Sequence, residues 1–144
     1  MKGRTNDWAG TIPLVVAHAK RERARTILRS AFPRRKGRLV FARNVDEVRE
    51  ALRTSLVDAV IVDIAGAQEE TWKATSLAGD HPTTAFFGIT PLRVADAAAL
   101  ANCVHRDFAG VLVEGIDDTV ARDLVLRASF SARWLRPWPS FRAS

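Results

Sequence analysis

The stretch Val57-Asp-Ala-Val-Ile-Val-Asp-Ile64 decides the fold of this chain. Its residues are apolar and mostly β-branched apart from Asp58 and Asp63. A short apolar run without polar alternation indicates a strand that is buried on both faces of a sheet. Parallel sheets bury their strands in this way because helices cover both faces, so we expect helices on either side of this run.

Four more strands are expected from similar short runs. They lie at residues 12–18, 38–42, 84–90 and 110–114. Amphipathic segments separate them and predict helices at residues 20–32, 45–56, 69–78 and 91–104, with a last helix that begins at Asp117 or Asp118. Asn44 is expected to cap the second helix, with Glu47 as its capping-box partner.

The buried faces of two helices can be read from the spacing of their apolar residues. In the helix at 69–78 we expect Trp72 and Leu77 to be buried. In the last helix the inward residues are expected to be Val120, Leu124, Val125 and Ala128.

Five βα units in about 120 residues predict one α/β domain. The expected architecture is a flavodoxin-like doubly wound sheet of five parallel strands, in the order 2-1-3-4-5, with helices on both faces. We expect an N-terminal extension at residues 1–10, the domain at residues 11–132, and a Trp/Pro/Arg tail or the start of a linker at residues 133–144.

Two of the expected strands end in residues that can carry chemistry. The run 57–64 holds Asp63 near its end, and Ala85-Phe-Phe-Gly-Ile-Thr-Pro91 holds Thr90. Over residues 11–132 this pattern resembles the receiver (CheY-like) domain of bacterial response regulators. The resemblance implies that Asp63 stands at the phospho-acceptor position and Thr90 at the position of the hydroxyl switch residue.

The chain departs from the receiver pattern where the phosphoryl group would be held. The resemblance implies a pair of magnesium-binding acids at Ala17 and His18, and a lysine at Glu114. Mg²⁺ prefers carboxylate oxygens, and phosphoryl transfer needs positive charge to offset the phosphoryl oxygens. We therefore expect a degenerate pseudo-receiver with a vestigial pocket, which is not an enzyme and takes no metal or cofactor.

Two details of this pocket follow from its charges. His18 either pairs with Asp63 in place of a metal or points to solvent, and the sequence leaves both open. Asp63→Asn is expected to be silent, or mildly stabilising if Asp63 and Glu114 repel each other.

The charge of the chain is unevenly distributed. Residues 20–43 hold ten Lys or Arg side chains and one acid, Glu22, although the net charge of the whole chain is only +6. Such a stretch can attract nucleic acid or an acidic partner, or it is simply a solvated helix face and a basic loop.

Other classes of protein find no support in the sequence. There is no Gly-x-Ser-x-Gly, Gly-x-Gly-x-x-Gly or Walker A motif. Cys103, the single cysteine, lies in an apolar stretch and is expected in the core. No apolar run is long enough to span a membrane, so we expect a cytoplasmic protein that does not contact the membrane.

The expected function is regulation by protein contact without catalysis. The resemblance implies the N-terminal regulatory part of a bacterial transcription regulator, whose effector lies beyond Ser144, or a stand-alone adaptor. Nucleic acid would then be reached only indirectly, through the effector. The alternatives are a phosphorylatable receiver and a nucleic-acid-binding protein that uses residues 20–43.

We also expect a homodimer. The last helix has more apolar residues than one buried face can use, and the surplus marks an interface. The candidates are Leu126, Phe130, Trp134 and Trp138, since Trp is enriched among interface anchors. The other interpretation is that the tail folds back over its own domain.

Overall fold

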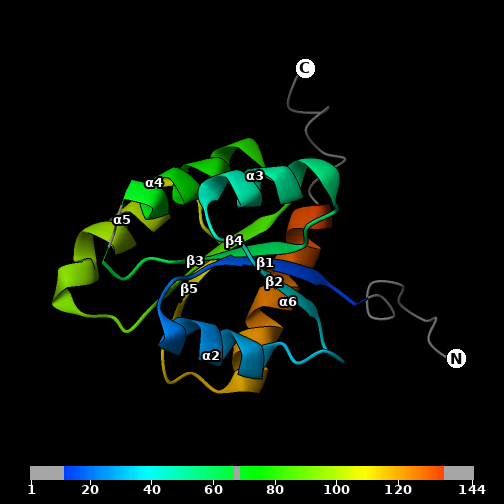
Figure 1. The fold of residues 1–144 in the computed structure, drawn as a ribbon, viewed down its shortest axis with the longest axis horizontal. Coiled ribbons are helices and arrows are strands. Elements are labelled where there is room, and N and C mark those ends of the chain that lie inside the picture. The colour runs from blue at the N-terminus through cyan, green and yellow to red at the C-terminus, as the bar shows by residue number, and fades with distance from the viewer. Residues whose placement is uncertain (1–11, 67–68, 135–144) are drawn as a thin grey trace, which may run out of the picture.

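The sheet has five parallel strands in the order β2-β1-β3-β4-β5. A computed structural model describes residues 12–66 and 69–134 of the chain. The strands are β1 (Leu14–His18), β2 (Arg38–Phe41), β3 (Ala59–Asp63), β4 (Ala85–Thr90) and β5 (Gly110–Val113). The predicted fold class and strand order are thus confirmed (Figure 1).

β3 lies at the centre of the sheet, and its apolar sequence explains this place. Ile61 lies opposite Ala17 of β1 on one side and Phe87 of β4 on the other. All five residues of β3 are buried. Because successive side chains of a strand point to opposite faces, Ile61 packs into one core and Val60 and Val62 into the other.

Helices cover both faces of the sheet. α2 (Glu22–Ala31) and α6 (Asp118–Trp134) lie on one face (Figure 1). The other face carries α3 (Val45–Thr54), α4 (Glu69–Ser76) and α5 (Ala97–His105). Two short 3₁₀ helices, η1 (Leu77–Asp80) and η2 (Val94–Asp96), precede β4 and α5. Cys103 is fully buried in the second core, as expected.

The start of α3 is capped in a slightly different way from the expected one. Asn44 accepts a hydrogen bond from the backbone N–H of Glu47 at 2.9 Å, as predicted. The carboxylate of Glu47 accepts from the backbone N–H of Arg43 at 2.7 Å and pairs with its guanidinium, so the reciprocal bond lies one residue earlier than in a capping box.

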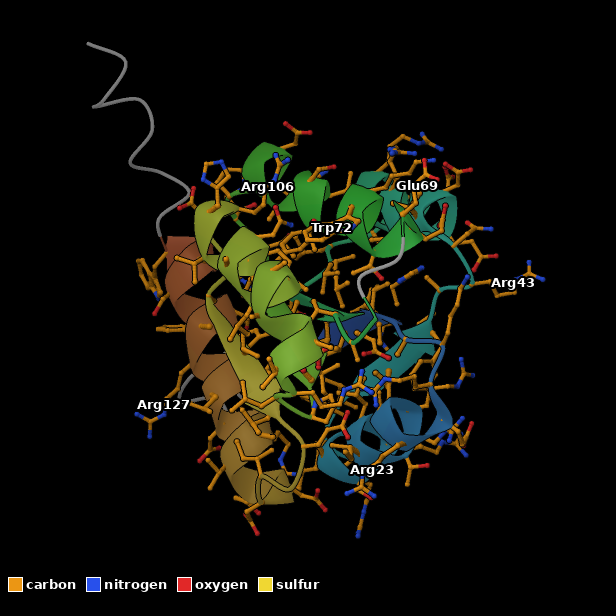
Figure 2. All side chains as sticks on the ribbon, turned by 90° about the vertical axis from the view of Figure 1, so that its left-hand side faces the viewer. Arg23, Arg43, Glu69, Trp72, Arg106 and Arg127 are labelled. Carbon is orange, nitrogen blue, oxygen red and sulfur yellow. The ribbon has the colours of Figure 1, made fainter. Side chains whose placement is uncertain are left out.

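Two helices differ from their predicted extent or burial. α5 begins at Ala97 and not at Pro91, because Leu92 has a left-handed φ of 64° that a helix cannot contain. In α4, Leu77 is buried just beyond the helix as expected, but Trp72 is only half-buried against the core (Figure 2).

The expected inward face of α6 is wrong at two positions. Val120 and Leu124 are 49% and 45% exposed, while Ala121, Val125 and Ser129 are buried. Ala121 and Ser129 are small, so the stripe at 121, 125 and 129 lets the helix approach the sheet closely. The bulkier Val120 and Leu124 are left outside.

α6 ends beyond the boundary that we expected between the domain and the tail. The helix continues to Trp134, two residues past the expected domain boundary, and Trp138 lies outside the described residues. Within residues 12–66 and 69–134, none of the helices is long and apolar enough to cross a membrane.

Candidate functional site

The residues singled out from the sequence gather at the carboxyl ends of the strands. His18 ends β1, Asp63 ends β3, Thr90 ends β4, and Glu114 follows β5. Ligands of doubly wound sheets bind at this edge, so it is the candidate site. Ala17 is fully buried within β1 and its methyl side chain offers no ligand atom.

Arg21 lies between the two carboxylates of this site, and the sequence did not predict it. Its Nε and Nη2 donate to Oδ2 and Oδ1 of Asp63 at 2.8 and 2.9 Å. Nη2 also donates to Glu114. Arg23, on the first turn of α2, adds a bond from its Nε to Glu114 Oε1 at 3.2 Å. The expected repulsion between Asp63 and Glu114 is therefore offset by a shared cation.

Burial makes this ionic cluster stronger than a surface pair. The side chains of Asp63 and Glu114 are only 6% and 5% exposed, and that of Arg21 is 31% exposed. Partial burial of Arg21 disfavours its charge. The hydrogen bonds that Arg21 donates to Asp63 and Glu114, and the coulombic attraction of these carboxylates, outweigh this effect, so the pKa of Arg21 rises above its ordinary value.

The local sequence explains why Arg21 is free for this role. It is the N-cap residue of α2, with extended backbone angles, and it makes no side-chain capping bond. Arginine has no acceptor with which to cap a helix. The extended backbone before the first turn of α2 instead leads its side chain to the end of β3.

His18 meets neither of the two expectations. Its side chain is buried and does not pair with Asp63. Its nearest carboxylate is that of Glu70, 3.9 Å from Nε2, and neither ring nitrogen has a hydrogen-bond partner among the described residues. Burial lowers the pKa of His18, and the attraction of Glu70 opposes this only in part. Burial therefore favours the neutral form of the ring, which lies close to Glu70 of α4.

Thr90 is turned toward the loop that follows β4. It is fully buried and donates from Oγ1 to Asp96 Oδ2 at 2.9 Å, while Leu92 N–H donates back to Oγ1 at the same distance. Burial of Asp96 would raise its pKa. Hydrogen bonds from Arg93 and Thr90 outweigh that effect, so the pKa of Asp96 is lowered. Thr90 is thus anchored to an ionised carboxylate.

The donor set does not fit a magnesium ion. Both oxygens of Asp63 already accept hydrogen bonds, from Arg21 and, at 3.1 Å, from the backbone N–H of Ala65. Among the described residues, no three His, Cys, Asp or Glu side chains gather closely enough to hold a metal. The guanidinium group of Arg21 occupies the position next to Asp63 that a bound magnesium ion would need.

No family model and no curated protein matches this sequence, but its fold matches solved structures. A response regulator from Thermotoga maritima superimposes with a TM-score of 0.68 at 16% identity, over 83% of this chain and 99% of the other. The signal receiver domain of an HD domain-containing protein from Pseudomonas fluorescens Pf-5 gives 0.68 at 17% identity, over 85% and 98%.

The chain has the receiver fold. A third receiver, from a sensor histidine kinase of Pseudomonas aeruginosa PAO1, matches with a TM-score of 0.66 at 10% identity, over 83% of this chain and 99% of its own. That receiver has a magnesium ion coordinated in its active-site cleft. In the present chain, the carboxyl ends of the strands carry the ionic cluster of Arg21, Asp63 and Glu114, called the Arg21 cluster below.

The Arg21 cluster predicts a stability cost for Asp63→Asn. The neutral amide leaves Arg21 without its strongest partner, so the free energy of unfolding should fall by about 2 kcal/mol. The matched control is Asp46→Asn, because Asp46 also pairs with an arginine but its side chain is 84% exposed. That change should cost less than about 0.5 kcal/mol. Urea denaturation measures both, and a silent or stabilising Asp63→Asn would contradict the cluster.

His18 predicts a loss of stability in mild acid. Its pKa in the folded state is below 6.5, so between the two pKa values the unfolded chain binds more protons. Stability should therefore fall as the pH drops from 7 to 5, by about 1.4 kcal/mol for each unit by which the pKa is lowered. The carboxylates of the chain contribute mainly below this window. Denaturation at several pH values should show a flatter profile for His18→Gln, and identical slopes would contradict the assignment.

Proposed function

We propose that this domain is a pseudo-receiver: a cytoplasmic signalling module that acts by protein contact without phosphotransfer. Its proposed place is the N-terminal regulatory part of a bacterial transcription regulator. The receiver fold supports the signalling role, and the observation that carries the finer proposal is the bidentate bond of Arg21 to Asp63. Nucleic acid would be reached only through the effector.

The distribution of charge supports a site that does not accept a phosphoryl group. In active receivers, as the resemblance implies, a lysine after the fifth strand supplies the cation; this chain has Glu114 there. The cation comes instead from Arg21, which two carboxylates already share. Arg21 is therefore engaged already, and Glu114 would repel the phosphoryl oxygens.

The position of Thr90 supports the same proposal. A hydroxyl switch must be able to turn toward the modified aspartate. Here Thr90 donates its only hydroxyl proton to Asp96 and accepts from Leu92, so both bonds hold it in the loop. Leaving that arrangement would cost the buried carboxylate of Asp96 one of its hydrogen bonds, so it costs free energy.

The two alternatives rest on specific features of the chain. A phosphorylatable receiver is favoured by the place of Asp63 at the end of β3 with Thr90 at the end of the adjacent strand. A nucleic-acid-binding protein is favoured by the basic residues at 20–43. Within that range Arg21 and Arg23 are engaged at the candidate site, and Arg25 lies over the ring of Phe41. Residues 34–38 are the main cationic part still open.

The phosphotransfer test is direct. Incubation with acetyl phosphate and Mg²⁺ should leave the intact mass unchanged, and beryllofluoride with Mg²⁺ should leave the spectra of the amide groups unchanged. A receiver domain that is known to be phosphorylated serves as the positive control. A mass gain of one phosphoryl group that Asp63→Asn abolishes would replace the proposal by the phosphorylatable alternative.

We also propose that the domain forms a homodimer through the outer face of α6. Val120, Leu124 and Trp134 are all exposed there, Trp134 by 61%. Leu126 and Phe130 are half-buried, so the face is displaced toward the start of the helix from the one expected. The rings of Phe130 and Trp134 pack edge to face, with centroids 5.8 Å apart, which extends the apolar surface along the helix.

A charge on this face should disrupt the dimer. Val120→Glu places a carboxylate in the proposed interface, and sedimentation at micromolar concentration should then show a monomer where the wild type is a dimer. Val40→Glu is the matched control, because both valines are 49% exposed and Val40 lies on edge strand β2. A monomeric wild type, or equal effects of the two changes, would contradict the proposed interface.

A further inference from the structure

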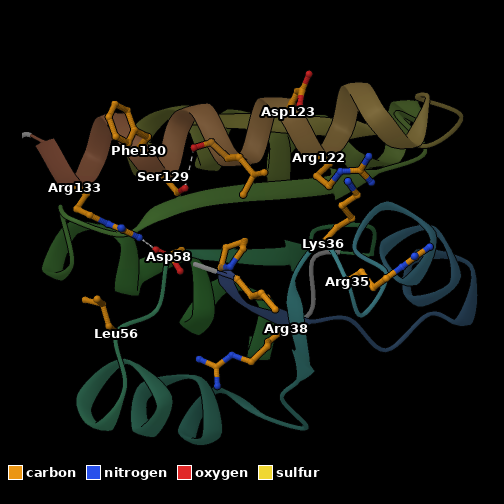
Figure 3. A pocket seen from close by; sticks show the side chains of 13 residues that line it. Arg35, Lys36, Arg38, Leu56, Asp58, Arg122, Asp123, Ser129, Phe130 and Arg133 are labelled. Carbon is orange, nitrogen blue, oxygen red and sulfur yellow. Dashed lines mark hydrogen bonds and ion pairs between the residues drawn. The ribbon is translucent and has the colours of Figure 1, made fainter. Parts of the chain in front are cut away.

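A groove opens at the end of the sheet opposite to Asp63. It encloses about 550 Å³ between α6 and the segments that lead into β1, β2 and β3 (Figure 3). Ile12 and Pro13 precede β1, Arg38 begins β2, and Asp58 precedes β3. The groove is therefore formed at the amino ends of the strands, and it shares no residue with the Arg21 cluster.

The groove is strongly cationic. Its lining contains five cationic and two anionic side chains, an excess of three positive charges; the cations are Arg35, Lys36, Arg38, Arg122 and Arg133. They come from three separate parts of the chain: the turn after α2, the start of β2, and α6. Tertiary structure thus gathers charges that the sequence shows only in part as a basic stretch.

The acidic residues of the groove do not neutralise these charges. Asp58 accepts a hydrogen bond from the backbone N–H of Leu14 at 2.8 Å and pairs with Arg133, which reaches across from α6 (Figure 3). The side chains of Arg35, Lys36 and Arg38 are exposed and make no ion pair or side-chain hydrogen bond with a described residue. Asp123 is the single remaining carboxylate of the lining.

The first and last residues of the sequence carry a net positive charge, so they do not complement the groove. Residues 1–11 contain Lys2, Arg4 and one acid, Asp7, while residues 135–144 contain Arg136 and Arg142 and no acid. An occupant that complements this groove electrostatically must be anionic, and neither of these two segments is.

Size and lining narrow the class of ligand. A volume near 550 Å³ lies in the range of small-molecule sites. Besides the cations, the walls carry apolar side chains at Ile12, Leu56 and Leu126. A ligand with several negative charges and an apolar or planar part would use both kinds of wall, and a nucleotide has these properties.

We propose that this groove binds a nucleotide-sized ligand with at least two phosphate charges, held by Arg35, Lys36 and Arg38 with help from Arg122. Arg122 donates one bond to the carbonyl of Ala31 at 2.7 Å, which fixes its side chain along the groove wall and leaves further N–H donors. Guanidinium groups bind phosphate oxygens in bidentate geometry. Three arginines therefore suit a ligand with several phosphate oxygens better than a ligand with a single carboxylate. The site is independent of the proposed loss of phosphotransfer at Asp63.

The test is calorimetric titration of the full chain with ATP, with pyrophosphate and with a single-stranded oligonucleotide of thymidines, each without metal at low salt. We expect ATP to bind at one site per chain, and pyrophosphate more weakly because it lacks the base. Affinity should fall as salt is raised, since the contacts are ionic. If pyrophosphate binds as tightly as ATP, the groove recognises only the phosphates, and the proposal of a nucleotide ligand is wrong.

Paired variants locate the site. Arg35→Ala with Lys36→Ala should weaken ATP binding at least about tenfold, because two charge-assisted contacts are lost. The control is Arg106→Ala with Arg127→Ala, which removes the same charge from two exposed arginines outside the groove (Figure 2). Circular dichroism checks that both variants fold. No binding of ATP, equal losses in both variants, or binding of the oligonucleotide alone would overturn the proposal.

Discussion

The guanidinium group of Arg21 bridges Asp63 and Glu114, and the arrangement of the carboxyl end of the sheet depends on this bridge. Two nearly buried carboxylates side by side would be costly without a cation between them. Arg21 stabilises both charges and links the loop after β1 to the ends of β3 and β5. The same bond that holds the loop in place also occupies the carboxylate that the resemblance to receivers places at the phospho-acceptor position.

The receiver fold here carries a closed ionic site at one end and an open cationic groove at the other. At the carboxyl end, the buried carboxylates have cationic partners: Arg21 binds Asp63, and Arg93 binds Asp96. At the amino end, Arg35 and Arg38 have none among the described residues. An external anionic ligand gains most binding energy from cations that have no partner within the protein. A cation that is already in an ion pair gains little from a second partner.

α6 contributes to three different surfaces of the domain, one with each of its sides. Ala121, Val125 and Ser129 face the sheet and allow close packing. Another side lines the groove with Arg122, and the outer side exposes Val120. A helix can serve three surfaces in this way because its side chains project around the whole circumference.

The sequence by itself determined the sheet and the position of the site. Strands such as 57–64, apolar without alternation, must be buried on both faces, so they predict a parallel sheet covered by helices. Since parallel strands end at the same edge, Asp63, Thr90 and Glu114 could be placed together before any coordinates were known. These inferences succeed because the periodicity of side chains along a strand or helix is a local property of the chain.

Tertiary structure alone decided which side chains became partners within that site. Arg21 is 42 residues from Asp63 and 93 from Glu114, and no spacing rule joins them. His18 lies beside Glu70 instead of Asp63 for the same reason. The side of α6 that faces the sheet was also decided by packing, since small residues permit an approach that Val120 and Leu124 would block. Ion pairs and close packing depend on the paths of loops in space, which the pattern of residues along the chain does not encode locally.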